Sequence, residues 1–163
     1  MTEGKMNFQE HMIEVTKAAA KEAFQYAKAV PADKVEWSPL ENGRTTLDLC
    51  RELAMCPTWC KETIEKEGPP EFSEEAFAAI KKEQEQWKTV EDCEAECGRR
   101  LETLYAFFKT IPDGQLANTK WLPYDGGRDF TVAEMMDYPR WNFNYHTGQI
   151  AYIQTLYGDR DMH

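Results

Sequence analysis

The stretch Trp141-Asn142-Phe143-Asn144-Tyr145-His146-Thr147-Gly148-Gln149-Ile150 is the most informative of the chain, because it lies in the last predicted helix and carries the clearest candidate site. Asn142 and His146 are four residues apart, and side chains at that spacing lie on one face of a helix. We therefore expect the two side chains to reach the same ligand. The chain has three histidines, and only His146 lies in a strongly patterned context; the others are His11 and His163.

Four long segments, the last of which contains this stretch, have apolar residues at steps of three and four, which is the pattern of amphipathic helices. Prolines and glycines separate them, and Thr45 and Ser73 are predicted helix caps. The predicted helices are residues 7–29, 45–67, 90–110 and 131–157, with a short helix at 73–87 and a turn-rich loop or small hairpin at 121–127. Strand signals are otherwise nearly absent. The pattern predicts an all-α four-helix bundle with a long crossover connection, with residues 1–163 as a single domain.

Two prolines, Pro57 and Pro139, fall inside predicted helices. A proline within a helix has no N–H to donate, so the carbonyls of Leu53 and Met135 lose their usual partners. Each proline lies close to a candidate site residue. The two interpretations are a tolerated kink and a role in shaping a pocket.

The formal net charge of −10 opposes two kinds of partner. Nucleic acids and anionic membrane surfaces both require clustered Lys and Arg, so we expect neither as a partner. No apolar run is long enough to span a bilayer, and residues 1–10 lack the apolar segment of a signal peptide. We therefore expect a cytoplasmic protein. The five cysteines agree with a reducing compartment. Their number is odd, and Cys56–Cys60 and Cys93–Cys97 have helical spacing, while Cys50 stands apart.

Several stretches together carry a resemblance to a known family. They are Val35-Glu36-Trp37-Ser38-Pro39 before Gly43-Arg44-Thr45-Thr46, then Glu52-Leu53-Ala54-Met55-Cys56, and finally His146-Thr147-Gly148-Gln149-Ile150 with Leu156-Tyr157-Gly158. In the order and spacing of these stretches, from Asn7 to Gly158, the chain resembles the DinB-like (damage-inducible) family of four-helix bundle proteins.

The resemblance implies a site for a divalent metal. Members of the family typically hold the metal with three histidines, one on the second helix and two on the last helix. At the matching positions this chain has Cys56, Asn142 and His146, and Thr147 stands where the family has an arginine. The chain therefore keeps one histidine of the three.

Two main interpretations of Cys56, Asn142 and His146 remain open. In the first they form a rearranged metal site, for which thiolate and imidazole are good zinc ligands and an amide oxygen is a poor one. In the second the pocket has lost its metal, and His146 is hydrogen-bonded inside the bundle. Glu52, one turn before Cys56, is an alternative or supporting ligand. We accordingly predict a divalent metal, zinc or nickel, that is weakly bound or absent.

A third interpretation of the site concerns the pairs Cys56–Cys60 and Cys93–Cys97, whose sulfurs would bind zinc or monovalent copper if they converged. Buried cysteines more often pack as small hydrophobes. The aromatic residues near the site have the same two explanations, a pocket lining or, more often, core packing; they are Trp59, Trp141, Tyr145 and Tyr152.

Two functions follow from these alternatives. The resemblance implies a metal-dependent transferase of a low-molecular-weight thiol, or a related enzyme, in which the metal activates the thiol. The other candidate is a non-catalytic bundle that binds a small molecule after losing its metal. A homodimer is also expected, from the resemblance and from a surplus of aromatics that either a second subunit or the loop at residues 121–130 covers: Phe107, Phe108, Trp121 and Phe130.

Overall fold

The structure, a computed structural model, describes residues 6–163; residues 1–5 of the predicted domain lie outside the described part. Its helices are α1 (Phe8–Lys28), α2 (Thr46–Glu65), α3 (Glu74–Gln84), α4 (Val90–Phe108) and α5 (Val132–Leu156). A 3₁₀ turn (Asp113–Gln115) and the strands β1 (Thr119–Leu122) and β2 (Arg128–Thr131) lie between α4 and α5. The predicted helices are therefore all present, and the loop at 121–127 closes a two-stranded antiparallel hairpin.

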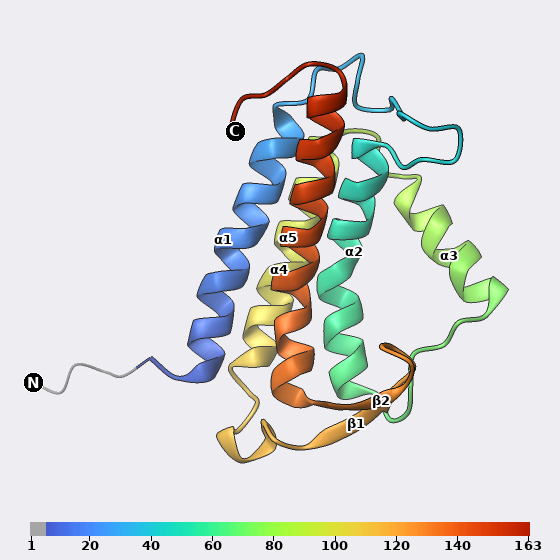
Figure 1. Cartoon of the computed structure of the whole chain (residues 1–163). Coiled ribbons are helices and arrows are strands. Elements are labelled where there is room, and N and C mark those ends of the chain that lie inside the picture. The colour runs from blue at the N-terminus through green and yellow to red at the C-terminus, as the bar shows by residue number, and fades with distance from the viewer. Residues whose placement is uncertain (1–5) are drawn as a thin grey trace, which may run out of the picture.

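The four long helices α1, α2, α4 and α5 pack side by side around one hydrophobic core (Figure 1). The connection from α2 to α4 carries α3 and returns along the length of the bundle, so α2 and α4 run in the same direction. The all-α four-helix bundle with a long crossover connection is thereby confirmed. Within the described residues, none of the helices combines the length and apolarity that crossing a membrane requires.

Capping side chains fix where the helices begin. Thr45 and Ser73 accept hydrogen bonds from backbone N–H groups in the first turns of α2 and α3, as predicted. At α2 the capping box is incomplete, because the Asp48 carboxylate pairs with Arg44 at 2.7 Å and does not reach back to the cap. Reciprocal capping boxes instead start α1, α4 and α5, with Asn7, Thr89 and Thr131 as caps.

The hairpin closes the lower end of the bundle in Figure 1, under α2 and α5. Lys120 on β1 donates hydrogen bonds to the backbone carbonyls of Thr63, Ile64 and Lys66, and so satisfies the C-terminal end of α2. Within the hairpin, a Cβ on Gly127 would lie 2.8 Å from the Trp121 ring, so the indole packs against glycine.

Two cysteine thiols supply the hydrogen bonds that the two internal prolines cannot donate. Cys97 of α4 donates its S–H to the Leu53 carbonyl at 3.4 Å, and Cys60 of α2 donates to the Met135 carbonyl at 3.3 Å. These are the carbonyls that Pro57 and Pro139 leave without an N–H partner. The thiols therefore satisfy buried backbone acceptors and join α4 to α2 and α2 to α5. All five cysteines are free and buried, as predicted for thiols.

This pairing predicts a coupling between Cys97 and Pro57. In the Pro57→Ala variant the new N–H can donate to Leu53, so the thiol is no longer needed. We expect Cys97→Ala to cost less unfolding free energy in that background than in the native chain, by roughly 0.5–1 kcal/mol. Urea unfolding of the four proteins measures the coupling. The cycle of Cys97→Ala with Pro139→Ala is the control and should be additive; equal coupling in both cycles contradicts the pairing.

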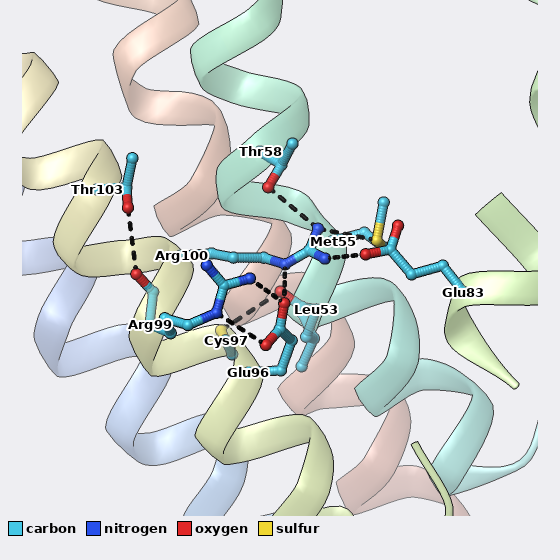
Figure 2. A network of polar contacts seen from close by, with 9 residues as sticks. All are labelled: Leu53, Met55, Thr58, Glu83, Glu96, Cys97, Arg99, Arg100 and Thr103. Atoms are coloured by element: carbon cyan, nitrogen blue, oxygen red, sulfur yellow. Dashed lines mark hydrogen bonds and ion pairs between the residues drawn. The ribbon is translucent and has the colours of Figure 1, made fainter. Parts of the chain in front are cut away.

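Helix α3 contributes no buried residue, and Arg100 of α4 reaches it from the bundle through Glu83. The Arg100 side chain is only 8% exposed. Figure 2 shows its partners, which come from three helices: Met55 and Thr58 of α2, Glu83 of α3 and Glu96 of α4. Its guanidinium also lies 5.2 Å from the ring centre of Trp87, directly after α3. This buried cation therefore links the crossover connection to α2 and α4, together with Arg51 of α2, which donates to the Trp87 carbonyl.

Candidate functional site

The candidate site lies where α2 faces α5. Glu52 and Cys56 are one turn apart on α2, and Asn142 and His146 are one turn apart on α5. Cys56, Asn142 and His146 are all buried. The structure places Asn142 against the Cys56 sulfur and His146 against Glu52, so the residues form two neighbouring pairs across the helix contact.

A chain of polar contacts surrounds His146. Its Nε2 lies 2.9 Å from Glu52 Oε1, and its Nδ1 lies 2.6 Å from Gln149 Oε1. The other oxygen of Glu52 accepts a hydrogen bond from Arg44, which also donates to Asp48. Both ring nitrogens of His146 are thus occupied by side chains of this protein.

The Glu52 carboxyl is held in its charged form. Burial alone would raise its pKa, but the hydrogen bonds and charges of His146 and Arg44 outweigh burial and lower the pKa to about 2. Arg44 is shared between Glu52 and Asp48, so its single positive charge faces two carboxylates.

Cys56 is held in its neutral form. Burial raises the pKa of its thiol to about 12, and contacts with Asn142 and Tyr138 lower it only in part. A nucleophilic cysteine needs a lowered pKa and a basic partner. Here the nearest imidazole is occupied by Glu52 and Gln149. The combination of Cys56, His146 and Asn142 therefore does not form a nucleophile with its base.

The donor set fits a zinc or nickel ion poorly. Zinc binds thiolates, imidazole nitrogens and carboxylates. Here burial favours the protonated form of the Cys56 thiol, and other side chains already contact the His146 nitrogens and the Glu52 carboxylate. Asn142 could offer a cation only its amide oxygen, which is a poor ligand for zinc. Within residues 6–163, no group of three or more His, Cys, Asp and Glu side chains is placed to hold a metal ion, and this includes the paired cysteines.

Aromatic rings flank the site on the outer face of α5, and the prediction that they are core residues is wrong for three of them. Trp141, Tyr145 and Tyr152 are each more than half exposed, while Trp59 is partly buried. The Trp141 and Tyr145 rings stack with centres 5.2 Å apart, and the edge of Tyr145 meets the His146 ring.

Two hollows lie away from this site, one beside the start of α4 and one between the first halves of α1 and α5. Of the site residues, Glu52 reaches solvent, with its side chain 25% exposed. The sequence interpretation named Glu52 but missed Arg44 and Gln149. Their spacing was the available signal, because Arg44, Asp48 and Glu52 recur every four residues and Gln149 follows His146 by three.

The lowered pKa of Glu52 predicts a pH-dependent contribution to stability. A depressed folded-state pKa stabilises above the unfolded value, near 4.5, and this stability is lost as pH falls toward 2. Because solvent reaches the pair, we expect Glu52→Gln to cost about 1–2 kcal/mol of unfolding free energy at neutral pH and much less near pH 2. Urea unfolding across this range measures the difference. The control is Glu62→Gln, at an exposed position of α2. A free-energy cost for Glu52→Gln that does not vary with pH contradicts the pairing.

Comparison with known proteins supports the fold. No protein-family model and no curated protein matches the chain. Among solved structures, YfiT from Bacillus subtilis, described as a probable metal-dependent hydrolase with an unusual four-helix bundle topology, matches with a TM-score of 0.71 and 15% identity, over 97% of this chain and 93% of that chain.

Two further structures match over 90% of this chain. The DinB-like protein YjoA from Bacillus subtilis has a TM-score of 0.58 and 15% identity, over 91% of its own chain. The colibactin self-resistance protein ClbS, in complex with double-stranded DNA, has a TM-score of 0.62 and 12% identity, over 95% of its own chain. At these identities the likeness shows the fold alone. The chain therefore has the DinB-like four-helix bundle fold.

Proposed function

We propose that this chain is a small-molecule-binding protein with the DinB-like fold that works without a resident metal. The observation that supports the proposal most is the bonding of His146, because Glu52 and Gln149 occupy both of its ring nitrogens. Cys56 is a buried neutral thiol, and Asn142 adds only an amide. The three positions that the family resemblance assigns to metal ligands thus serve to join α2 to α5.

A ligand would lie over the contact between α2 and α5. Glu52 supplies a charged acceptor at the surface, and the Tyr138 side chain lies beside Cys56 on the same side. An aromatic surface with one fixed carboxylate suits a small, partly apolar molecule with a donor group. A low-molecular-weight thiol is one such molecule, and in this site it would be bound rather than activated.

The rival function is a metal-dependent enzyme, a hydrolase or thiol transferase, with Cys56, Asn142 and His146 as altered ligands. The likeness to YfiT, which is described as a probable metal-dependent hydrolase, favours this rival. It requires His146 to release Glu52 or Gln149 and Cys56 to lose its proton.

Calorimetric titration of Zn²⁺ and Ni²⁺ into reduced protein without a histidine tag distinguishes the two functions. We expect little or no binding heat, because no free nitrogen or thiolate is available. Tight one-to-one binding that His146→Ala abolishes and His163→Ala preserves would instead support the enzyme. Glutathione and free cysteine serve as small-molecule probes: a rise in the thermal midpoint that is independent of zinc and lost in Glu52→Gln supports the binding protein.

Binding of nucleic acid is not carried over from ClbS. That protein was solved with double-stranded DNA. For this chain we propose, as the sequence predicts, that nucleic acid is not a partner. The net charge of −10 supports it, because attraction to phosphates requires a surplus of Lys and Arg.

A further inference from the structure

The outer face of α5 lacks charge along most of its length. From Trp141 to Tyr157 the chain has no Asp, Glu, Lys or Arg, although charged residues make up 29% of the sequence. Exposed helix faces are normally charged or polar. Large hydrophobic side chains stand there instead, and each is about half exposed or more: Trp141, Tyr145, Tyr152 and Leu156.

These four side chains are arranged symmetrically along the helix. Trp141 and Leu156, and likewise Tyr145 and Tyr152, lie at equal distances on either side of the Gly148–Gln149 peptide. Steps of four, seven and four residues keep them on one face of the helix, over a length of about 22 Å. At the centre of this face, a Cβ on Gly148 would have no atom of its own chain within 4 Å.

We propose that this face of α5 binds the same face of a second copy, with the two α5 helices antiparallel about a two-fold axis near Gly148. In this arrangement Trp141 packs against the partner's Leu156, and Tyr145 against the partner's Tyr152. A two-fold interface must be self-complementary, and the symmetric spacing of the four side chains meets that condition. The absent side chain of Gly148 lets the helices approach closely where they cross.

The net charge of the chain also favours a second copy as the partner of this α5 face. Each copy has a net charge of −10, so two copies repel wherever acidic surfaces meet. An uncharged face is where they can meet without desolvating or opposing like charges. A half-exposed aromatic side chain can bury about 100 Å², so the four side chains supply about 400 Å² per copy, half of a typical interface of about 800 Å² per partner. Uncharged flanking residues such as Asn144 and Thr155 add to this, and the resulting dimer is of moderate affinity.

The second copy would also complete the candidate site. The Tyr145 and His146 rings lie edge to face with centres 5.3 Å apart, and Glu52, whose side chain is 25% exposed, contacts His146 at Nε2. A partner packed on Tyr145 would therefore form a wall beside Glu52. This surface differs from the aromatic patch that the sequence predicts as a dimer contact. In the structure, Phe108 of that patch is fully buried in the core, and Trp121 packs on Gly127.

Light scattering at micromolar concentration tests the proposal. We expect the native chain to have twice its monomer mass of 18.9 kDa. Gly148→Glu places two like charges beside the axis and should shift the mass to that of the monomer. Gly98→Glu is the matched control, because Gly98 is also exposed on a helix with nothing within 4 Å of a Cβ; this variant should remain a dimer. Circular dichroism checks that both variants stay folded.

Chemical cross-linking gives a second measurement. Gly148→Cys places one accessible thiol near the axis in each copy, whereas the five native cysteines are buried. A short bis-maleimide should join two copies of this variant and leave the native chain uncross-linked. A native monomer, or a dimer that Gly148→Glu leaves intact, overturns the proposal. A dimer that Trp121→Ser dissociates would place the interface at the hairpin instead.

Discussion

The double variant Cys56→His with Asn142→His should bind zinc and nickel at least about 100-fold more tightly than the native chain. The new imidazole at position 142 would lie one turn before His146 on α5, and the one at position 56 would face both from α2. Three imidazoles form a facial ligand set, whereas a neutral thiol and an amide do not. Glu52 already contacts one nitrogen of His146, and a carboxylate in that place orients a metal-binding histidine. The metal would displace Gln149 from the other nitrogen.

Calorimetry measures the gain in affinity, and thermal unfolding with and without zinc provides an independent measure. A larger side chain at buried Cys56 should destabilise the metal-free variant by about 1–3 kcal/mol, and zinc should restore that loss. The single variant Asn142→His is the control, since it supplies only two imidazoles and should gain much less. If the double variant binds no better than the native chain, then the ligand positions inferred from the family resemblance are wrong.

Local sequence signals were sufficient for the fold because they act within one turn of the chain. Thr45 and Ser73 cap helices in the structure as their sequence positions predict. The stripes of apolar residues bury one face of each long helix, and Pro57 and Pro139 stay within helices as the sequence indicated. These local signals could not predict which residues of other helices contact the capped, apolar and proline positions.

The candidate site depends on such long-range contacts. The carbonyls freed by the prolines were predictable, but the donors, Cys97 and Cys60, come from neighbouring helices. The partner of His146 on α2 was likewise open between Cys56 and Glu52, and the structure selects Glu52. Aromatic spacing alone did not separate core from surface, because it cannot say which side of α5 faces the bundle. The metal-ligand assignment of Cys56, Asn142 and His146 stays a prediction.

Arg100→Ala should be among the most destabilising single substitutions outside the hydrophobic core, at about 2–3 kcal/mol. It removes a buried cation that bonds to Glu83, Glu96 and Thr58 (Figure 2). The same guanidinium lies over the Trp87 ring. Losing one partner of a buried ion pair leaves the other charge uncompensated, and the cation–π contact and side-chain packing are lost as well. Glu83 is 44% exposed, so water compensates part of the loss.

We expect this large destabilisation because Arg100 is buried, and not only because it is charged. Arg99 is the matched control, because it also pairs with Glu96 but is 67% exposed; Arg99→Ala should change the unfolding free energy by no more than about 0.5 kcal/mol. Urea unfolding compares the two variants. Hydrogen exchange should also show faster exchange of the α3 amides in Arg100→Ala, because α3 has no buried residue of its own to hold it. Equal losses in both variants, or unchanged exchange in α3, would mean that other contacts hold the crossover connection to the bundle.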